Sequence, residues 1–198
     1  MTESSGRTLE QRPTDCERDE LTATLSRQAF VVRLTARAER ALRDGCGFGL
    51  CVVDLDHFKN INLSHGPTCG DDALRDIAQR LVRTTSAVPH SGAEAIIGRY
   101  DGNAFAVLVE TESPQELAAG AEALRQAVGG MRSPTAGGLS ASVGAVLARM
   151  GEPVDALLVR AEQALYLAKQ FGRNRVEIGR SPTPMRADRN VLALRRSA

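Results

Sequence analysis

Two aspartates separated by one residue, Asp54 and Asp56, directly follow a short apolar run at 48–53. Such a continuous run is typical of a strand that is buried on both faces. Carboxylates at the end of a strand face the crevice in which α/β sheets bind ligands. They could bind Mg²⁺, which takes one or two protein carboxylates and fills its remaining positions with phosphate oxygens and water. The alternative is that Asp56 only caps the next helix and Asp54 only contacts solvent.

Four further polar residues could bind a nucleotide. Asn62 and Asp71 lie at loop and helix-start positions, and the Asp71 carboxylate could accept two N–H donors from a base edge such as guanine. The alternative for Asp71 is a helix N-cap. Lys169 and Arg173 are four residues apart at the end of a predicted helix. They could bind phosphates, although cations also suit the negative end of a helix dipole.

The stretch from Arg99 to Phe105 separates two apolar runs, at 95–97 and 105–109. An Asp-Gly pair between strand-like runs is a strong hairpin signal, because both central residues of a type I′ turn need a positive φ. We therefore predict a two-residue turn at Asp101-Gly102, flanked by Tyr100 and Asn103. Its side chains should project from one end of a sheet.

The remaining pattern gives the elements that must position these residues. Apolar spacing and capping signals predict helices and strands in alternation. The helices are expected from about 21 to 42, from 56 to 64, from 70 onward, from 113 to 128 and from 153 to 168; the strands are expected at 48–53, 95–97, 105–109, 139–148 and 175–178. This order predicts an α/β (α+β) fold, a ferredoxin-like mixed sheet with a central hairpin and helices packed around it.

Composition limits the classes of function. The chain has 198 residues, is 42% hydrophobic and 25% charged, and carries a net charge of +1, so its charge predicts no binding to nucleic acid. No apolar run approaches the ~20 residues of a membrane span, and the N-terminal 20 residues lack the apolar stretch of a secretory signal. Four cysteines without CxxC spacing favour free thiols and a cytoplasmic location.

Five short motifs occur in a fixed order along the chain. They are Asp19-x-Leu21-Thr22, Asp54-Leu55-Asp56-His57-Phe58-Lys59-x-x-Asn62, Gly66-x-x-x-Gly70-Asp71-x-x-Leu74, Arg99-Tyr100 before the hairpin, and Ala164-Leu165-Tyr166-x-Ala168-Lys169-x-x-Gly172-Arg173-Asn174. In this order and spacing they resemble the GGDEF (diguanylate cyclase) family. We accordingly expect a disordered segment at 1–18, a GGDEF domain at 19–178 and an Arg-rich tail at 179–198.

The resemblance implies a fold shared with nucleotide cyclases and polymerase palms. In this family two domains pair, each holding one GTP with Mg²⁺. The 3′-hydroxyl of each nucleotide attacks the α-phosphate of the other, which yields cyclic di-GMP and pyrophosphate. By the same resemblance, Asp54 matches the metal-ligating aspartate and Leu55 matches the residue whose backbone carbonyl also contacts metal.

The resemblance also assigns nucleotide-binding positions. Asn62 and Asp71 match the two residues that read guanine. The Phe-Lys pair that opens the short helix corresponds to Phe58 and Lys59, which we include among the nucleotide-binding residues. The phosphate-binding pair corresponds to Lys169 and Arg173.

The chain departs from the family at the signature motif itself, which reads Asp101-Gly102-Asn103-Ala104-Phe105. Asn103 stands where the family has its second metal-binding carboxylate, and Asp101 replaces the first glycine. An amide oxygen can ligate Mg²⁺ but brings no negative charge. Losing ~3 kcal/mol of transition-state stabilisation costs about a hundredfold in rate. Asp101 is a possible compensating ligand.

We therefore predict a degenerate GGDEF domain that binds GTP, has a regulatory role in cyclic di-GMP signalling, and has weak or no cyclase activity. Its expected partners are GTP and either a second copy of the chain or another signalling protein. Two alternatives remain open at this point. One is an active diguanylate cyclase, and the other is a protein-interaction scaffold that binds no nucleotide.

Overall fold

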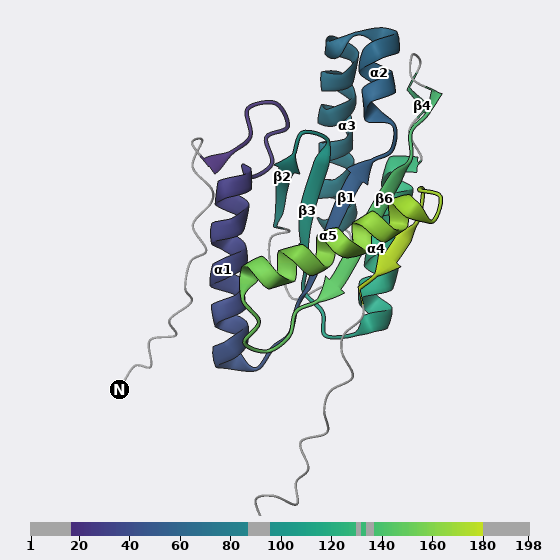
Figure 1. Cartoon of the computed structure of the whole chain (residues 1–198). Coiled ribbons are helices and arrows are strands. Elements are labelled where there is room, and N and C mark those ends of the chain that lie inside the picture. The colour runs from purple at the N-terminus through teal and green to yellow at the C-terminus, as the bar shows by residue number, and fades with distance from the viewer. Residues whose placement is uncertain (1–16, 87–95, 130–131, 134–136, 180–198) are drawn as a thin grey trace, which may run out of the picture.

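The computed structural model describes residues 17–86, 96–129, 132–133 and 137–179. A five-stranded mixed sheet in the order β2-β3-β1-β6-β7 runs through the described part of the chain (Figure 1). The strands are β1 (Gly49–Leu55), β2 (Ile97–Asp101), β3 (Ala104–Val109), β6 (Ala141–Leu147) and β7 (Val176–Ile178). The central strand β1 is antiparallel to both β3 and β6, and β7 is parallel to β6. The predicted mixed α/β fold with its hairpin is confirmed.

Helices cover both faces of this sheet. The five helices of the described residues are α1 (Arg27–Asp44), α2 (Phe58–His65), α3 (Pro67–Ser86), α4 (Pro114–Gly129) and α5 (Val154–Gln170). Alternate residues of β1 divide between two cores: Leu50 and Val52 pack with α1 and α5, whereas Cys51 and Val53 pack with α3 and α4. Figure 1 shows α5 crossing one face of the sheet, with α3 and α4 behind it.

Helix α5 lies unusually close to strand β6. A Cβ atom at Gly144 would come within 2.2 Å of the Leu165 backbone nitrogen and 2.3 Å of the Ala161 carbonyl oxygen. Both of these atoms belong to the backbone of α5, so they cannot move aside as a flexible side chain would. Glycine at 144 is therefore required for this approach of helix to strand.

Two predicted helix boundaries were wrong. The first helix begins at Arg27 rather than near 21, because Leu25 pairs with the edge strand β2: Leu25 N donates to Ile97 O at 3.0 Å and Arg99 N donates to Leu25 O at 2.8 Å. The third helix begins at Pro67 rather than at Gly70, because proline suits the first helical turn, where its missing N–H is not needed.

Some parts of the chain were not anticipated or lie outside the described residues. A two-stranded ladder joins β4 (Arg132–Ser133) to β5 (Gly137–Gly138), and strands of two residues are too short to leave a pattern in the sequence. The predicted terminal segments, 1–18 and 179–198, lie almost wholly outside the described residues. None of the helices in the described ranges is both long and apolar enough to cross a membrane.

Candidate functional site

Three strand ends meet at one edge of the sheet. In the antiparallel register, Asp54 near the end of β1 lies opposite Ala104 at the start of β3 and opposite Ser142 at the start of β6. The turn that joins β2 to β3 therefore lies beside the end of β1. This arrangement brings Asn103 to Asp54 and Leu55, from which it is separated by 49 and 48 residues.

The side-chain amide of Asn103 acts as a hydrogen-bond donor at this edge. Its Nδ2 atom lies 3.2 Å from Asp54 Oδ1 and 3.0 Å from the backbone oxygen of Leu55. Both neighbours can only accept hydrogen bonds, because the aspartate is ionised and the other atom is a carbonyl oxygen. The NH₂ group, and not the amide oxygen, therefore faces them.

Lys169, in the last turn of α5, reaches the same carboxylate. Its Nζ atom lies 2.8 Å from Asp54 Oδ1. Burial raises the pKa of Asp54, and the charge of Asp56 adds to this rise, whereas Lys169 and Asn103 oppose it. We call Asp54, Leu55, Asn103 and Lys169 the Asp54 cluster. In it a partly buried carboxylate is paired with one cation and one amide.

Asp56 has a role that the sequence analysis missed. The interpretation of Asp56 as a helix cap was wrong, because the N-cap residue of α2 is His57 and Asp56 faces β6 instead. Its carboxylate accepts hydrogen bonds from Ser140 Oγ at 2.7 Å, Ser142 Oγ at 2.7 Å and Asn174 N at 3.0 Å. These donors hold the start of β6 and the end of α5 against β1. They are more than 80 residues away in the sequence, so local spacing gave no signal.

The hairpin turn differs from the predicted one. The two turn residues are Gly102 and Asn103, flanked by Asp101 and Ala104, and the register shifts between Arg99 and Asp101. Neither turn residue has a positive φ, so the predicted type I′ turn at Asp101-Gly102 was wrong.

Arg99 links this turn to Asp19 by hydrogen bonds. Arg99 donates to the Gly102 carbonyl oxygen at 2.8 Å and to both carboxylate oxygens of Asp19 at 3.2 Å. Burial alone would raise the pKa of Asp19, but hydrogen bonds from Thr22 and the Arg99 cation outweigh this and lower it. Asp101 is exposed, and among the described residues its carboxylate bonds only to Gly102 N, at 2.8 Å.

Asn62 and Asp71 lie on neighbouring helices. Asn62 is half-buried on α2, and its Oδ1 atom is buried with no hydrogen-bond partner among the described residues. A Cβ atom at Gly70 would lie 1.9 Å from that oxygen, so glycine there leaves room for the amide. Asp71 follows on α3 and is also half-buried. It lies inside the helix, so the alternative that it caps α3 was wrong.

The other predicted nucleotide-binding residues lie on the surface or partly buried. Lys59 on α2 and Arg173 after α5 are exposed, and neither side chain has a partner within the described ranges. Phe58 is partly buried and packs against the core that α3 and α4 share with the sheet. Arg173 has a φ of 63°, and its backbone N donates to Ala168 O at 3.0 Å. The chain thus leaves α5 in a left-handed turn.

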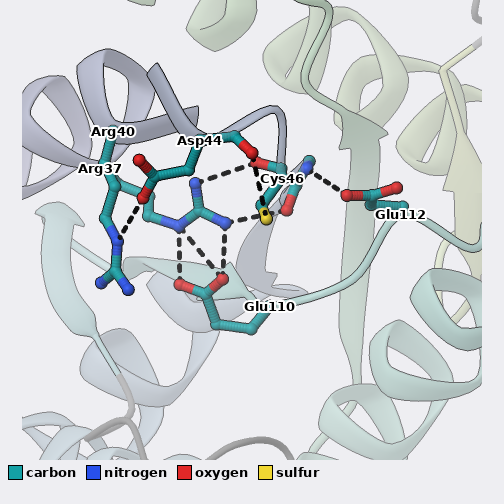
Figure 2. Close-up of polar contacts among 7 residues, drawn as sticks. Arg37, Arg40, Asp44, Cys46, Glu110 and Glu112 are labelled. Atoms are coloured by element: carbon teal, nitrogen blue, oxygen red, sulfur yellow. Dashed lines mark hydrogen bonds and ion pairs between the residues drawn. The ribbon is translucent and has the colours of Figure 1, made fainter. Parts of the chain in front are cut away.

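A second polar cluster lies at the opposite end of β1 (Figure 2). We call it the Arg37 cluster; it comprises Arg37, Cys46, Gly47, Glu110 and Glu112. Arg37 Nη2 lies 2.6 Å from Glu110 Oε2, and its guanidinium also donates to Cys46 O at 3.2 Å and Gly47 O at 2.8 Å. Glu112 accepts from Gly47 N at 2.6 Å. A cavity of about 410 Å³ lies beside this cluster, between α1 and the start of α5, and it includes none of the predicted site residues.

Part of the oxygen set that a magnesium ion would use in the Asp54 cluster is already hydrogen-bonded, and these contacts leave Asp54 Oδ2 unused. Mg²⁺ needs oxygen ligands with free lone pairs. Here Asp54 Oδ1 already accepts from Lys169 and Asn103, and the Leu55 carbonyl oxygen accepts from the same amide. Across the described residues, no group of three or more His, Cys, Asp or Glu side chains is placed to hold a metal ion.

Comparison with known proteins identifies the class. The family model described as "Diguanylate cyclase, GGDEF domain" matches residues 16–175, and the chain belongs to this family. It is therefore a GGDEF domain. Cyclases of this family use Mg²⁺ with GTP.

Particular relatives support this assignment. The chain is 30% identical to diguanylate cyclase DosC of Escherichia coli K12, over 81% of this chain and 34% of that protein. It is 34% identical to diguanylate cyclase DgcP of Pseudomonas aeruginosa, over 81% of this chain and 23% of that protein. The crystal structure of the GGDEF domain of DgcB from Caulobacter crescentus, in complex with c-di-GMP, matches with a TM-score of 0.76 and 31% identity, over 86% of this chain and all of that one. The chain spans about a third or less of these curated relatives.

Proposed function

We propose that this chain is a GTP-binding, regulatory GGDEF domain with weak or no cyclase activity. The observation that carries the proposal is the contrast between two amides. Asn62 has a buried side-chain oxygen without a hydrogen-bond partner among the described residues. Asn103, in contrast, donates from its NH₂ group to Asp54 Oδ1 and to the Leu55 carbonyl oxygen, which are the atoms that would ligate a metal ion. The Asn62 amide thus has unused hydrogen-bonding capacity for a ligand, whereas the Asn103 amide presents hydrogen atoms where a cation would need oxygen.

The base-binding part of the site fits guanine. Guanine presents N–H donors on its Watson–Crick edge, which require acceptors. Asn62 Oδ1 is an acceptor buried beside Gly70, and leaving it unsatisfied costs free energy that would be recovered when the amide turns to accept from a bound donor. Asp71, half-buried on the neighbouring helix, supplies two further acceptor oxygens. We assign the base to these two residues and the phosphates to Lys59, Lys169 and Arg173, with Phe58 packed beneath.

The catalytic part of the site does not fit cyclisation. Attack by a 3′-hydroxyl on an α-phosphate needs positive charge at the hydroxyl and at the phosphate oxygens. Two carboxylates would hold that charge in place. This chain offers Asp54 alone, and Asp54 is paired with Lys169. Asp101 is directed at its own turn rather than at Asp54.

A regulatory role requires a protein partner. Cyclase chemistry needs two such domains face to face, so a second copy of this chain or of a related domain is one candidate. The solved structure of diguanylate cyclase SiaD from Pseudomonas aeruginosa, in complex with its activator SiaC, is 30% identical to this chain. By analogy we propose that the nucleotide-bound form of this domain contacts another signalling protein in the cytoplasm.

Calorimetric titration of the chain with GTP and with ATP, followed by chromatography of the same sample for cyclic di-GMP, tests the proposal. We expect GTP to bind at least about tenfold more tightly than ATP, because ATP lacks the donor pattern that Asn62 and Asp71 accept. No product should form. Product formation would instead identify an active cyclase, and the absence of both binding and product would leave only the scaffold.

A matched pair of variants on α2 makes this test specific. Asn62→Ala removes the unsatisfied acceptor, whereas Asn60→Ala changes an exposed residue of the same type two positions away. GTP affinity should fall about tenfold or more in the first variant and stay unchanged in the second. Equal effects of the two substitutions would contradict the assignment of the base to Asn62.

A further inference from the structure

We propose that this site binds GTP without a divalent cation, with the Lys169 ammonium and the Asn103 amide taking the place that a metal ion would occupy. This inference rests on the proposed function, because it concerns the same nucleotide at the same site. It differs from the use of GTP with Mg²⁺ that is general in the family. Its basis is the way in which the acceptors of the Asp54 cluster are already used.

Two acceptor oxygens at the end of β1 already receive hydrogen bonds from protein donors. A cation at the end of β1 would need the carboxylate of Asp54 and the carbonyl oxygen of Leu55. Asp54 Oδ1 receives Lys169 Nζ at 2.8 Å and Asn103 Nδ2 at 3.2 Å, and the Leu55 oxygen receives the same amide at 3.0 Å. Both oxygens therefore face hydrogen atoms, so a cation that used them would have to displace two donors, and Asp54 Oδ2 is the one carboxylate oxygen that these contacts leave open.

The Asp54 cluster contains one carboxylate and one ammonium group. An acidic residue at 103 would place a second carboxylate beside Asp54, and the two would repel each other and the triphosphate unless a cation lay between them. Asn103 removes one negative charge from this position. Lys169 then balances the charge of Asp54 within the cluster itself. The Asp54 cluster is then neutral rather than negative, so it repels a polyanionic ligand less than a site with two carboxylates would.

Lys169 is carried by a helix that is packed closely against the sheet. Lys169 lies in the last turn of α5, which packs on the backbone of β6 at Gly144. Just beyond α5, the backbone N of Asn174 is fixed to Asp56 at 3.0 Å. The ammonium group is thus held at the end of β1 by contacts on both sides of it in the sequence. Phosphate oxygens can bind its remaining N–H donors without any rearrangement of the helix.

The test is a calorimetric titration of the full chain with GTP, once in Mg²⁺ and once in EDTA at matched ionic strength. We expect the two dissociation constants to agree within about threefold. A larger ratio in favour of Mg²⁺ would overturn the inference and leave the proposed function intact. No binding in either buffer would overturn the proposed function, and the inference with it.

Two substitutions should make GTP binding depend on Mg²⁺. Asn103→Asp restores a second carboxylate, so GTP binding in EDTA should weaken about tenfold or more and recover when Mg²⁺ is added. Lys169→Gln removes the built-in cation and should also make binding depend on Mg²⁺. Asn60→Asp adds the same charge on the exposed face of α2 and serves as the control, in which the ratio between the two buffers should stay within threefold of one. Insensitivity of Asn103→Asp to Mg²⁺ would contradict the inference.

Discussion

The two ends of strand β1 carry polar clusters of opposite kinds. At the Gly49 end, the guanidinium of Arg37 is bound to one carboxylate and two carbonyl oxygens, and Glu112 binds the remaining backbone N–H of Gly47. At the Leu55 end, burial raises the pKa of Asp54, and Asn62 Oδ1 has no partner among the described residues. The polar groups of the Arg37 cluster are thus hydrogen-bonded to one another, whereas at the Leu55 end one buried acceptor has no partner among the described residues.

This difference separates groups that stabilise the fold from groups that await a ligand. Buried polar groups in folded proteins are almost always hydrogen-bonded, so an unsatisfied one calls for an explanation. Titratable groups with perturbed pKa values also gather at functional sites. We therefore expect the Leu55 end to be functional and the Gly49 end, whose polar groups are paired within the Arg37 cluster, to be structural. The substitutions below test that division.

The largest effect is expected at the Arg37 cluster. Arg37→Met keeps the aliphatic length of the side chain but leaves Glu110 and two carbonyl oxygens without their donor. The Arg37 side chain is only 8% exposed, so breaking this pair should lower the free energy of unfolding by about 3 kcal/mol. Urea denaturation measures this loss. GTP affinity of the folded protein should not change; a loss below about 1 kcal/mol would show that the cluster is not structural.

A smaller effect is expected where stability and binding meet, at Gly70. Gly70→Ala places a methyl group 1.9 Å from Asn62 Oδ1, so the amide must move. Unfolding free energy should fall by about 1–3 kcal/mol, and GTP affinity should fall about tenfold. Gly120→Ala on α4 is the control, because its Cβ meets only Val109 Cγ1 at 3.8 Å, and it should stabilise the protein slightly. Unchanged GTP affinity in Gly70→Ala would separate Asn62 from the nucleotide.

A substitution of Asp54 is expected to raise the free energy of unfolding rather than lower it. Because burial raises its pKa in the folded state, the protonated form of Asp54 favours folding at low pH, and this contribution is lost as pH rises through the folded pKa. Asp54→Asn should therefore raise the free energy of unfolding at pH 7 by about 0.5–1 kcal/mol. The gain over the wild-type chain should vanish below about pH 4 in thermal scans. Destabilisation at pH 7 would show that the Lys169 pair outweighs the burial of Asp54.

The smallest effect is expected at a surface pair outside both clusters. Hydrogen bonds from Arg125 lower the pKa of Glu122 to about 2, from an ordinary value of 4.5. A lowered carboxyl pKa contributes stability above the unfolded value, and this is lost as pH falls from about 4.5 toward 2. Glu122→Gln should cost about 0.5 kcal/mol at pH 7, and less at high salt. A cost that does not depend on salt would show that the pair acts through packing.

The sequence predicted the elements better than their contacts. Continuous apolar runs identified β1 and β3, and Ser113-Pro114 located the start of α4, because these signals are local. The role of Asp56 depends on Ser140 and Ser142, which reach it only through the pairing of β1 with β6. The same limit applies to Asn103: its identity predicted a weakened site, but only the side-chain hydrogen bonds show that its Nδ2 atom faces Asp54 and Leu55.

The close approach at Gly144 sets the position of a helix whose two ends lie in different parts of the molecule. Helix α5 carries Lys169 at one end and, at the other, Val154 and Leu157, which line the cavity beside the Arg37 cluster. Gly144 lies under the helix between these ends. Any larger residue there would push the helix off the sheet by about 1 Å or more, since non-bonded heavy atoms need roughly 3.5 Å of separation. A side chain at position 144 should therefore alter both the spacing between Lys169 and Asp54 and the width of the cavity, because one helix carries residues of both.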